Sequence, residues 1–295
     1  MEAAEADDET PRRFALLGLV LFLLAGCGTI RAWMPFSGKE ATTKRPAPSV
    51  VRTTGTLLLA GGGRTPGAIV AEAAKLAAAN ARVLVIPLAS AARDPGKASL
   101  EMWLRAGFAQ GEILDAESPE RAAAQIEAAG FLWMTGGEAT RLVGRLLDAN
   151  LADAVRRRYE AGALVGGNAA GAAALAELLV AGGDEDEIVQ GRVQTVGGLG
   201  LWPGVIADPD FVAKKRFNRL AAAVLDHPRL VGVGIDDATG VVVSGTTLRV
   251  VGDGSVVVLD ARRAKVNASR AGEASSATGV EMQVLAAGMT FDLAR

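Results

Sequence analysis

The chain has 295 residues, of which 50% are hydrophobic, 22% charged and 4% aromatic, and its formal net charge is −2. This composition can bury a sizeable core and excludes a disordered chain, and the near-neutral charge gives no electrostatic reason to expect a nucleic-acid partner. Because Cys27 is the single cysteine and His227 the single histidine, an internal disulfide and a metal site built from Cys and His are excluded.

The N-terminal segment has the features of an export signal. Arg12 and Arg13 precede the uncharged apolar run 14–25 (FALLGLVLFLLA). This run is shorter than the ~20 residues of a membrane-spanning helix and suits the core of a signal peptide. The alternative is a buried core segment followed by an ordinary free cysteine.

Residues 24–27 (LAGC), which overlap the end of this run, resemble the lipobox of bacterial lipoproteins. The resemblance implies that residues 1–26 are removed, that Cys27 carries the lipid, and that residues 27–53 tether the body to a membrane. It places the protein in the cell envelope, on the periplasmic side. Gly28 after the cysteine favours the outer membrane.

From residue 54 onward, short apolar runs bounded by glycine or proline alternate with alanine-rich segments that favour helices. We predict strands at 56–60, 83–87, 112–115, 131–135 and 163–166, and helices at 66–79, 98–108, 120–129, 141–161, 170–180 and from about 211 to 227. Ser118 followed by Pro119 is typical of a helix N-cap and first helical residue.

The predicted strands are rich in Val, Ile and Leu without alternation, which is typical of a parallel sheet covered by helices on both faces. Val-rich runs after residue 231, separated by Gly or Asp-Gly, predict antiparallel hairpins that close the sheet. The prediction is therefore one α/β domain over residues 54–295, with α/β/α layers and a mostly parallel central sheet.

Residues 166–172 (GGNAAGA) lie between a predicted strand and an alanine-rich segment. Small residues at this spacing are typical of a nucleophile elbow, which exposes its central side chain beside helix N–H groups that can stabilise an oxyanion. The central residue is Ala169, so the turn lacks the hydroxyl. A plain glycine-rich turn is the alternative.

Several motifs resemble, in order, those of the serine peptidase family that includes cyanophycinase and the aspartyl dipeptidases. They lie at 61–63 (GGG), 83–90 (VLVIPLAS), 135–142 (TGGEATRL), 166–172 (GGNAAGA), 198–201 (GLGL), 208–220 (DPDFVAKKRFNRL) and 234–239 (GIDDAT). The resemblance implies the fold of class I glutamine amidotransferases and hydrolysis of peptides by a serine, a histidine and a glutamate.

Those three catalytic positions are occupied by Ala169, Asp210 and Asp237. Alanine cannot attack a carbonyl, and an aspartate is a weaker base than a histidine. The sequence therefore predicts a catalytically inactive binding or interaction module for a peptide or amino-acid-like ligand, without a cofactor. The alternative is a hydrolase of aspartyl peptides or cyanophycin-like polymers with a remodelled site.

Other positions that the resemblance assigns to the site are of two kinds. The oxyanion turn falls on Gly62, Gly63 and Ala170. The former substrate pocket falls on Glu138, Ala139, Asp208 and Asp236, where Ala139 replaces a substrate-binding glutamine.

Three further hypotheses remain open. His227 is a relocated base or a surface residue at a helix end. Ser90 and Thr135 are alternative hydroxyls, although no base is evident beside them. The aspartates at 208, 210, 236 and 237 bind a divalent cation or an amine, or else Asp208 and Asp236 pair with Arg216 and Arg219.

Overall fold

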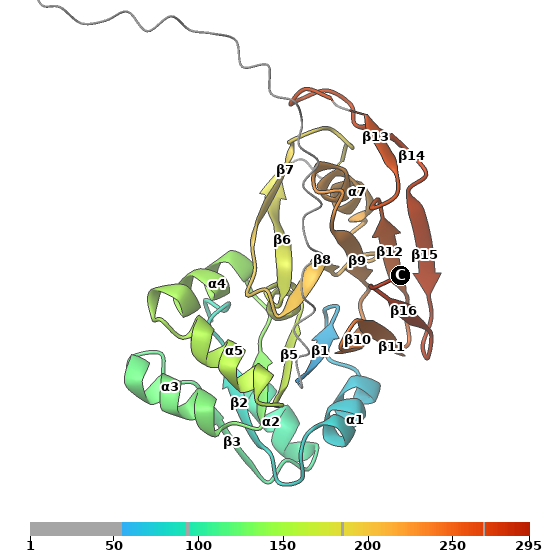
Figure 1. Ribbon diagram of the computed structural model, residues 1–295. Coiled ribbons are helices and arrows are strands. Elements are labelled where there is room, and N and C mark those ends of the chain that lie inside the picture. Colours follow the sequence, from blue (N-terminus) through green and yellow to red (C-terminus); the bar gives the residue numbers. More distant parts are fainter. Residues whose placement is uncertain (1–54, 93–94, 184–185, 268) are drawn as a thin grey trace, which may run out of the picture. The chain divides into compact units, whose positions relative to one another are not determined.

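The protein is represented by a computed structural model that describes residues 55–92, 95–183, 186–267 and 269–295 (Figure 1). The predicted signal peptide over 1–26, lipidated Cys27 and the tether over 27–53 lie outside the described residues and stay predictions. Within the described residues, no helix has both the length and the apolar character that crossing a membrane requires.

Strands and helices alternate in the first part of the chain, as predicted. They are β1 (Thr56–Ala60), α1 (Gly67–Leu76), β2 (Arg82–Ile86), α2 (Lys97–Arg105), β3 (Gln110–Ile113), α3 (Pro119–Ala128), β4 (Phe131–Met134), α4 (Ala139–Asp148), α5 (Ala152–Glu160) and β5 (Leu164–Asn168). The Ser118 hydroxyl accepts a hydrogen bond from the Arg121 backbone N–H at 3.3 Å, so the predicted N-cap of α3 is confirmed. The predicted helix over 141–161 is two helices, because Asn150 takes a left-handed φ of 55° between them.

The second part of the chain is mostly strand. Its elements are α6 (Ala170–Ala173), β6 (Ala176–Gly183), β7 (Val193–Gly197), β8 (Trp202–Pro209), α7 (Phe217–Asp226), β9 (Val231–Ile235), β10 (Thr239–Ser244), β11 (Thr247–Gly252), β12 (Val256–Asp260), β13 (Lys265–Asn267), β14 (Ser276–Thr278), β15 (Glu281–Leu285) and β16 (Thr290–Asp292).

Two helix predictions in this part are wrong. The helix expected over 170–180 has one turn, and β6 follows at Ala176 because Leu178 and Leu179 pair with both neighbouring strands. Alanine's intrinsic helix preference is weak enough for such pairing to override it. The helix expected from about 211 begins only at Phe217, after a stretch of turns.

The larger sheet, among the described residues, has eight strands in the order β16-β11-β10-β1-β5-β4-β2-β3. Strands β1, β5, β4, β2 and β3 pair in parallel, whereas β10, β11 and β16 extend the sheet antiparallel. Helices α1 and α2 bury Ile69 and Trp103 against one face, and α3, α4 and α5 bury side chains such as Ile126 and Leu146 against the other. The predicted α/β fold with a mostly parallel central sheet is confirmed.

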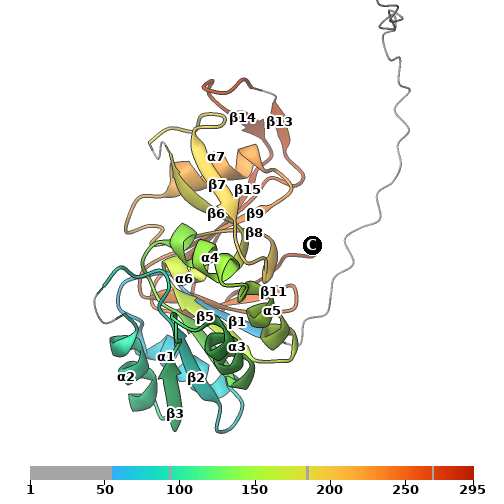
Figure 2. The same cartoon turned by 90° about the vertical axis from the view of Figure 1, so that its left-hand side faces the viewer.

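A separate six-stranded sheet, again counted over the described residues, was not predicted. Its order is β15-β12-β9-β8-β6-β7. Helix α7 lies beside this sheet (Figure 2), and its Leu220 and Val224 are buried in a cluster with side chains of the sheet. The hairpin β10–β11 joins the larger sheet as predicted, but β9 and β12 belong to this second sheet. The site described next lies where the two sheets meet.

Candidate functional site

The turn after β1 touches the ends of strands from both sheets. The Ala169 backbone N–H, after β5, donates to the Ala60 carbonyl at 2.9 Å. The Asp210 N–H, after β8, donates to the Gly61 carbonyl at 2.5 Å, and the Gly61 N–H donates to the Thr239 carbonyl at 2.8 Å. The carboxyl ends of these strands therefore meet around residues 61–63, which is where α/β folds commonly carry their sites.

The turn between β5 and α6 has the sharp geometry of a nucleophile elbow. Ala169 has φ 48° and ψ −115°, a conformation uncommon outside glycine. Close backbone contacts explain the flanking glycines: a Cβ on Gly167 would lie 2.4 Å from the Gly171 carbonyl carbon, and one on Gly171 would lie 2.2 Å from the Met134 carbonyl oxygen. The side chain that the turn presents is a methyl group. Ala170 follows as the first residue of α6.

A second glycine turn faces Ala169 from the end of β4. A Cβ placed on Gly136 would lie 3.7 Å from the Ala169 Cβ. Next to it, Thr135 is 9% exposed, and its hydroxyl has no hydrogen-bond partner among the described residues. The Ser90 hydroxyl accepts from the Ala92 backbone N–H at 3.1 Å, so it stabilises the turn in which it lies. The hypothesis of a relocated hydroxyl nucleophile gains no support from this arrangement.

Asp210, which the sequence resemblance assigns to the position of the base, forms ion pairs. It follows β8 with a left-handed φ of 54°. Its Oδ2 lies 2.7 Å from Lys214 Nζ and 3.5 Å from an Arg216 guanidinium nitrogen. With its side chain 12% exposed, the carboxylate of Asp210 is held by these two cations at the edge of the site.

Two further aspartates of the site, Asp208 and Asp236, have structural partners. Asp208 is fully buried and forms a two-pronged ion pair with Arg219, while an Arg216 nitrogen lies 3.7 Å from it. This pairing agrees with the hypothesis that Asp208 pairs with Arg216 and Arg219, which was the alternative to cation binding. Asp236 instead accepts hydrogen bonds from the backbone N–H groups of residues 212 and 213, each at 3.1 Å.

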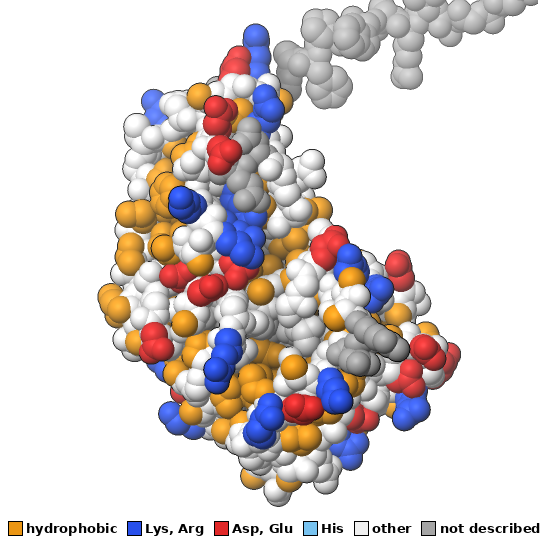
Figure 3. Space-filling view, turned by 180° about the vertical axis from the view of Figure 1, so that it is seen from behind, with side chains coloured by type: hydrophobic (Ala, Val, Ile, Leu, Met, Phe, Trp, Pro, Cys, Tyr) orange, Lys and Arg blue, Asp and Glu red, His pale blue; other side chains and the backbone are white. Residues whose placement is uncertain are grey.

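A metal site gains no support either. Among the described residues, no group of three or more His, Cys, Asp or Glu side chains is arranged to hold a metal ion. On the face shown in Figure 3, basic and acidic side chains lie beside one another near the middle of the molecule, an arrangement that favours ion pairs over a purely acidic cation site.

Asp237, which the sequence resemblance assigns to the orienting position, approaches Asp210. A Cβ on Gly62 would be 1.8 Å from Asp210 Oδ1 and 2.9 Å from Asp237 Oδ1, so both oxygens crowd the same glycine. Partial burial raises the pKa of Asp237, and so do the neighbouring carboxyls of Asp210 and Asp236, whereas Lys214 opposes the shift. The three residues that the motif resemblance assigns to catalytic positions thus surround one turn.

The remaining predicted site residues are two pocket residues at the start of α4 and one oxyanion-turn residue after β1. Ala139 begins α4, and the Glu138 carboxylate before it pairs with Arg141 at 2.8 Å and accepts from the Thr140 hydroxyl at 2.5 Å. Gly63 has a φ of 60°, and its carbonyl accepts from the Asn168 side-chain amide at 3.1 Å, which ties this turn to the elbow.

His227 lies at the end of α7, beside the second sheet. It directly follows α7, at the helix end predicted for it, and its Nε2 lies 2.8 Å from the Thr195 hydroxyl of β7. This contact uses the imidazole in joining α7 to β7. The hypothesis of a relocated base therefore gains no support.

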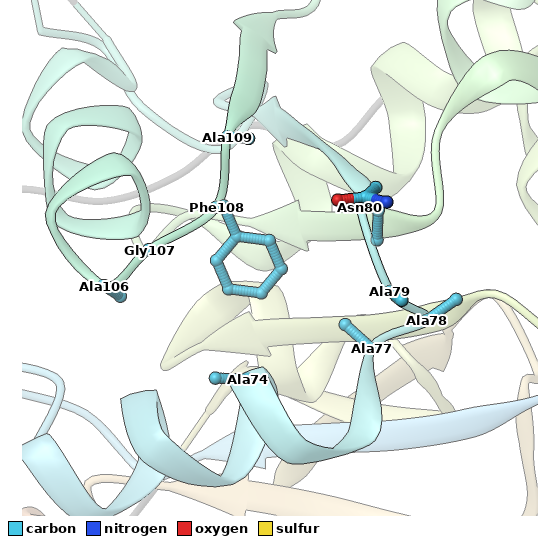
Figure 4. A pocket seen from close by; sticks show the side chains of 10 residues that line it. Ala74, Ala77, Ala78, Ala79, Asn80, Ala106, Gly107, Phe108 and Ala109 are labelled. Atoms are coloured by element: carbon cyan, nitrogen blue, oxygen red, sulfur yellow. The ribbon is translucent and has the colours of Figure 1, made fainter.

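A shallow cavity of about 150 Å³ lies elsewhere, between the ends of α1 and α2 (Figure 4). It is lined by Phe108 and small residues such as Ala77 and Gly107, and the described residues around it include no ionisable side chain. It adjoins the amino ends of β2 and β3, and the lining offers no chemistry that would make it a catalytic site.

The family model of peptidase family S51 matches residues 57–251. The chain belongs to peptidase family S51. The matched range includes Ala169, Asp210 and Asp237.

Relatives in this family are named cyanophycinase. The chain is 36% identical over 194 residues to cyanophycinase from Trichormus variabilis, which covers 62% of this chain and 64% of that protein. It is 35% identical over 190 residues to cyanophycinase from Synechococcus elongatus, covering 60% of this chain and 58% of the relative. The chain therefore spans less than two thirds of the length of these curated relatives.

A solved peptidase structure from an acI-B1 Actinobacterium has the same fold. It superposes with a TM-score of 0.58 at 20% identity and covers 82% of this chain and 98% of that one.

Two features of this S51 site were missed by reasoning from sequence. One is the ion pair between Asp210 and Lys214, for which the four-residue spacing was an available signal. The other is the crowding of Asp210 Oδ1 and Asp237 Oδ1 against Gly62, since the sequence placed both aspartates in one site without predicting that they meet at this glycine.

Proposed function

We propose that this S51-family protein is a catalytically inactive relative of cyanophycinase that uses the former catalytic site to bind a peptide or an amino-acid-like ligand. The observation that carries the proposal is Ala169, which stands at the centre of a sharp strand-to-helix turn and presents no hydroxyl. Loss of a triad serine alone can lower the rate by about 10⁶, or roughly 8 kcal/mol of barrier.

The surroundings of Asp210 support the same proposal. A carboxylate paired with Lys214 and Arg216 lacks the imidazole geometry with which the family's histidine takes a proton from the nucleophile. Substitution of nucleophile and base together is what a site released from serine chemistry is expected to show.

We further propose that lipid on Cys27 anchors the protein at the periplasmic side of the cell envelope, with residues 27–53 as the tether. Palmitate labelling of the full chain in a bacterial host tests this. Label is expected in the wild-type protein and absent in Cys27→Ser. Equal labelling of both proteins would contradict the anchor.

Hydrolysis is tested with the full chain on cyanophycin and on aspartyl dipeptides, because the curated relatives are named for cyanophycin cleavage. No turnover above the blank is expected. A thermal-shift screen with the same compounds measures binding, since a ligand at 100 times its Kd stabilises the folded state by ~2.7 kcal/mol. Turnover that Asp210→Ala abolishes would contradict inactivity.

The elbow geometry allows a gain-of-function test. Because the turn around Ala169 is intact, the double variant Ala169→Ser with Asp210→His is expected to react with a fluorophosphonate, whereas Ala169→Ser alone reacts far less. A folded double variant that stays unlabelled would mean that the turn no longer presents residue 169 productively.

A hydrolase with a remodelled site is the second candidate. The observation that favours it is the approach of Asp210 and Asp237 to each other, because paired carboxyls with different proton affinities can act as acid and base. Turnover lost in both Asp210→Asn and Asp237→Asn would favour this candidate, and the hydrolysis assay should be run with and without a divalent metal.

A further inference from the structure

Two turns, each of which follows a strand of the second sheet, meet at Gly62. One follows β8 and carries Asp210, and the other links β9 to β10 and carries Asp237. Both turns include a residue with left-handed backbone, φ 54° at Asp210 and φ 56° at Ala238. The Oδ1 atoms of the two aspartates crowd the open side of Gly62, where a Cβ would lie within 1.8 and 2.9 Å of them.

No hydrogen-bond donor among the described residues serves the Asp237 oxygen that faces Asp210. Asp237 Oδ1 is buried and has no hydrogen-bond donor among the described residues. Two ionised carboxylates offer only acceptors to each other, whereas one proton between them supplies the missing donor. Asp210 Oδ2 is already paired with Lys214 and Arg216, whereas Asp237 has no such cationic partner among the ion pairs of the described residues. Asp237 is therefore the member that carries the proton.

The charged groups around the pair agree with this assignment. From the segment after β8 come Lys214 and Arg216, and the latter also faces Asp208. From the turn after β9 comes Asp236, a like charge for Asp237.

On the third side, the turn between β11 and β12 brings Asp253, whose backbone N–H donates to the Ala238 carbonyl at 3.0 Å. Residues 61–63 and 168–170, which complete the surroundings, contain no ionisable side chain. The carboxylates that act on Asp237 are thus those of Asp210 and Asp236, and the cations Lys214 and Arg216 are paired with Asp210.

We propose that Asp210 and Asp237 share one proton, and that this proton latches the turn after β8 to the turn after β9 across Gly62. Loss of the proton would leave two negative charges in contact and push the turns apart. The Gly61 backbone bonds to Asp210 and Thr239, one on each turn, so the separation would reach residues 61–63 beside Ala169. This device concerns the shape of the site and does not depend on what the site binds.

The sign of the pH dependence follows from the raised pKa of Asp237. A carboxyl whose pKa is higher in the folded than in the unfolded chain contributes stability that is complete below the unfolded value of about 3.9. That contribution is lost as the pH rises through the folded value. The latch is closed on the acid side and open on the alkaline side of this range.

Carbon-detected NMR of the full chain labelled at aspartate carboxyls tests the proposal. We expect Asp237 to titrate above the ordinary aspartate range, and the backbone amides of residues 61–63 to shift with the same midpoint. In Asp210→Asn, the amide group donates a hydrogen bond to Asp237, so the Asp237 midpoint should move to lower pH. Asp253→Asn, a matched change in the adjoining turn, should leave it in place.

Three results would overturn the latch. They are an ordinary midpoint for Asp237 in the wild-type protein, an unchanged midpoint in Asp210→Asn, and amides at 61–63 that do not follow the titration. Should Asp210→Asn fail to fold, urea unfolding of Asp237→Asn against pH decides. Wild-type stability relative to this variant should fall as the pH rises through the Asp237 midpoint, and a constant difference contradicts the proposal.

Discussion

The two sides of the candidate site are built from different materials. The side formed by the larger sheet consists of backbone turns, at 61–63, 135–137 and 167–171, in which glycines allow chain segments to approach within contact distance. The side formed by the second sheet consists of charged side chains, chiefly Asp208, Asp210 and their basic partners. The first side is thus held mainly by backbone contacts, and the second mainly by ion pairs.

The difference shows that the two sides of the site are constrained in different ways. The glycines of the elbow are held by backbone contacts that any occupant of position 169 needs, so replacing a hydroxyl by hydrogen disturbs no packing. On the other side, each charge needs a partner once it is buried. A new carboxylate at position 210 is accommodated beside the basic residues that this segment already carries.

The largest expected effect tests the charged side. Asp208→Ala leaves Arg219, 7% exposed, without its buried carboxylate, and should lower the free energy of unfolding by about 3–5 kcal/mol. Glu281→Gln removes a surface partner of Arg295 and should cost less than about 1 kcal/mol. Urea unfolding measures both. Similar losses in the two variants would show that the buried pair is no more constrained than a surface pair.

A change of similar kind tests the backbone side. Gly167→Ala pushes a Cβ into the backbone of residues 171 and 172 and should lower the free energy of unfolding by about 2–3 kcal/mol. Gly144→Ala, in the middle of α4 with open space around the added Cβ, should instead raise it by about 0.5–1 kcal/mol. If both variants were stabilised, the elbow would not be closely packed.

The smallest expected effect concerns position 169 itself. Its left-handed backbone strains alanine but not glycine, so Ala169→Gly should raise the free energy of unfolding by about 0.5–1 kcal/mol, the strain released exceeding the entropy lost. Thermal unfolding at several protein concentrations gives the value. A loss of more than about 1 kcal/mol would contradict the strained turn.

Local signals in the sequence predicted the layered α/β half of the fold well. The strand Thr56–Ala60 has the predicted bounds, and the Ser118 cap begins α3, because apolar runs and caps act within a few residues. The strand over 176–183 was mistaken for helix because its alanines favour helix locally while its pairing partners lie elsewhere in the sequence. The second sheet was missed for the same reason.

The site divides in the same way. Motif order located Ala169, Asp210 and Asp237, and the structure brings all three to the turn after β1. The approach of Asp210 to Asp237 depends on two turns that meet in space, and no local sequence pattern encodes such a meeting. The pairing of Asp208 with arginines was among the sequence hypotheses, whereas Asp236 accepts hydrogen bonds from backbone N–H groups in place of the arginine that was expected.

The central claim is that the S51 elbow of this protein holds no nucleophile. The most direct measurement is the intact mass of the full chain after exposure to a fluorophosphonate, with the Ala169→Ser, Asp210→His variant as the positive control. We predict an unchanged mass for the wild-type protein and an added phosphonyl group on the variant. A wild-type adduct on any serine or threonine of the site would contradict the claim.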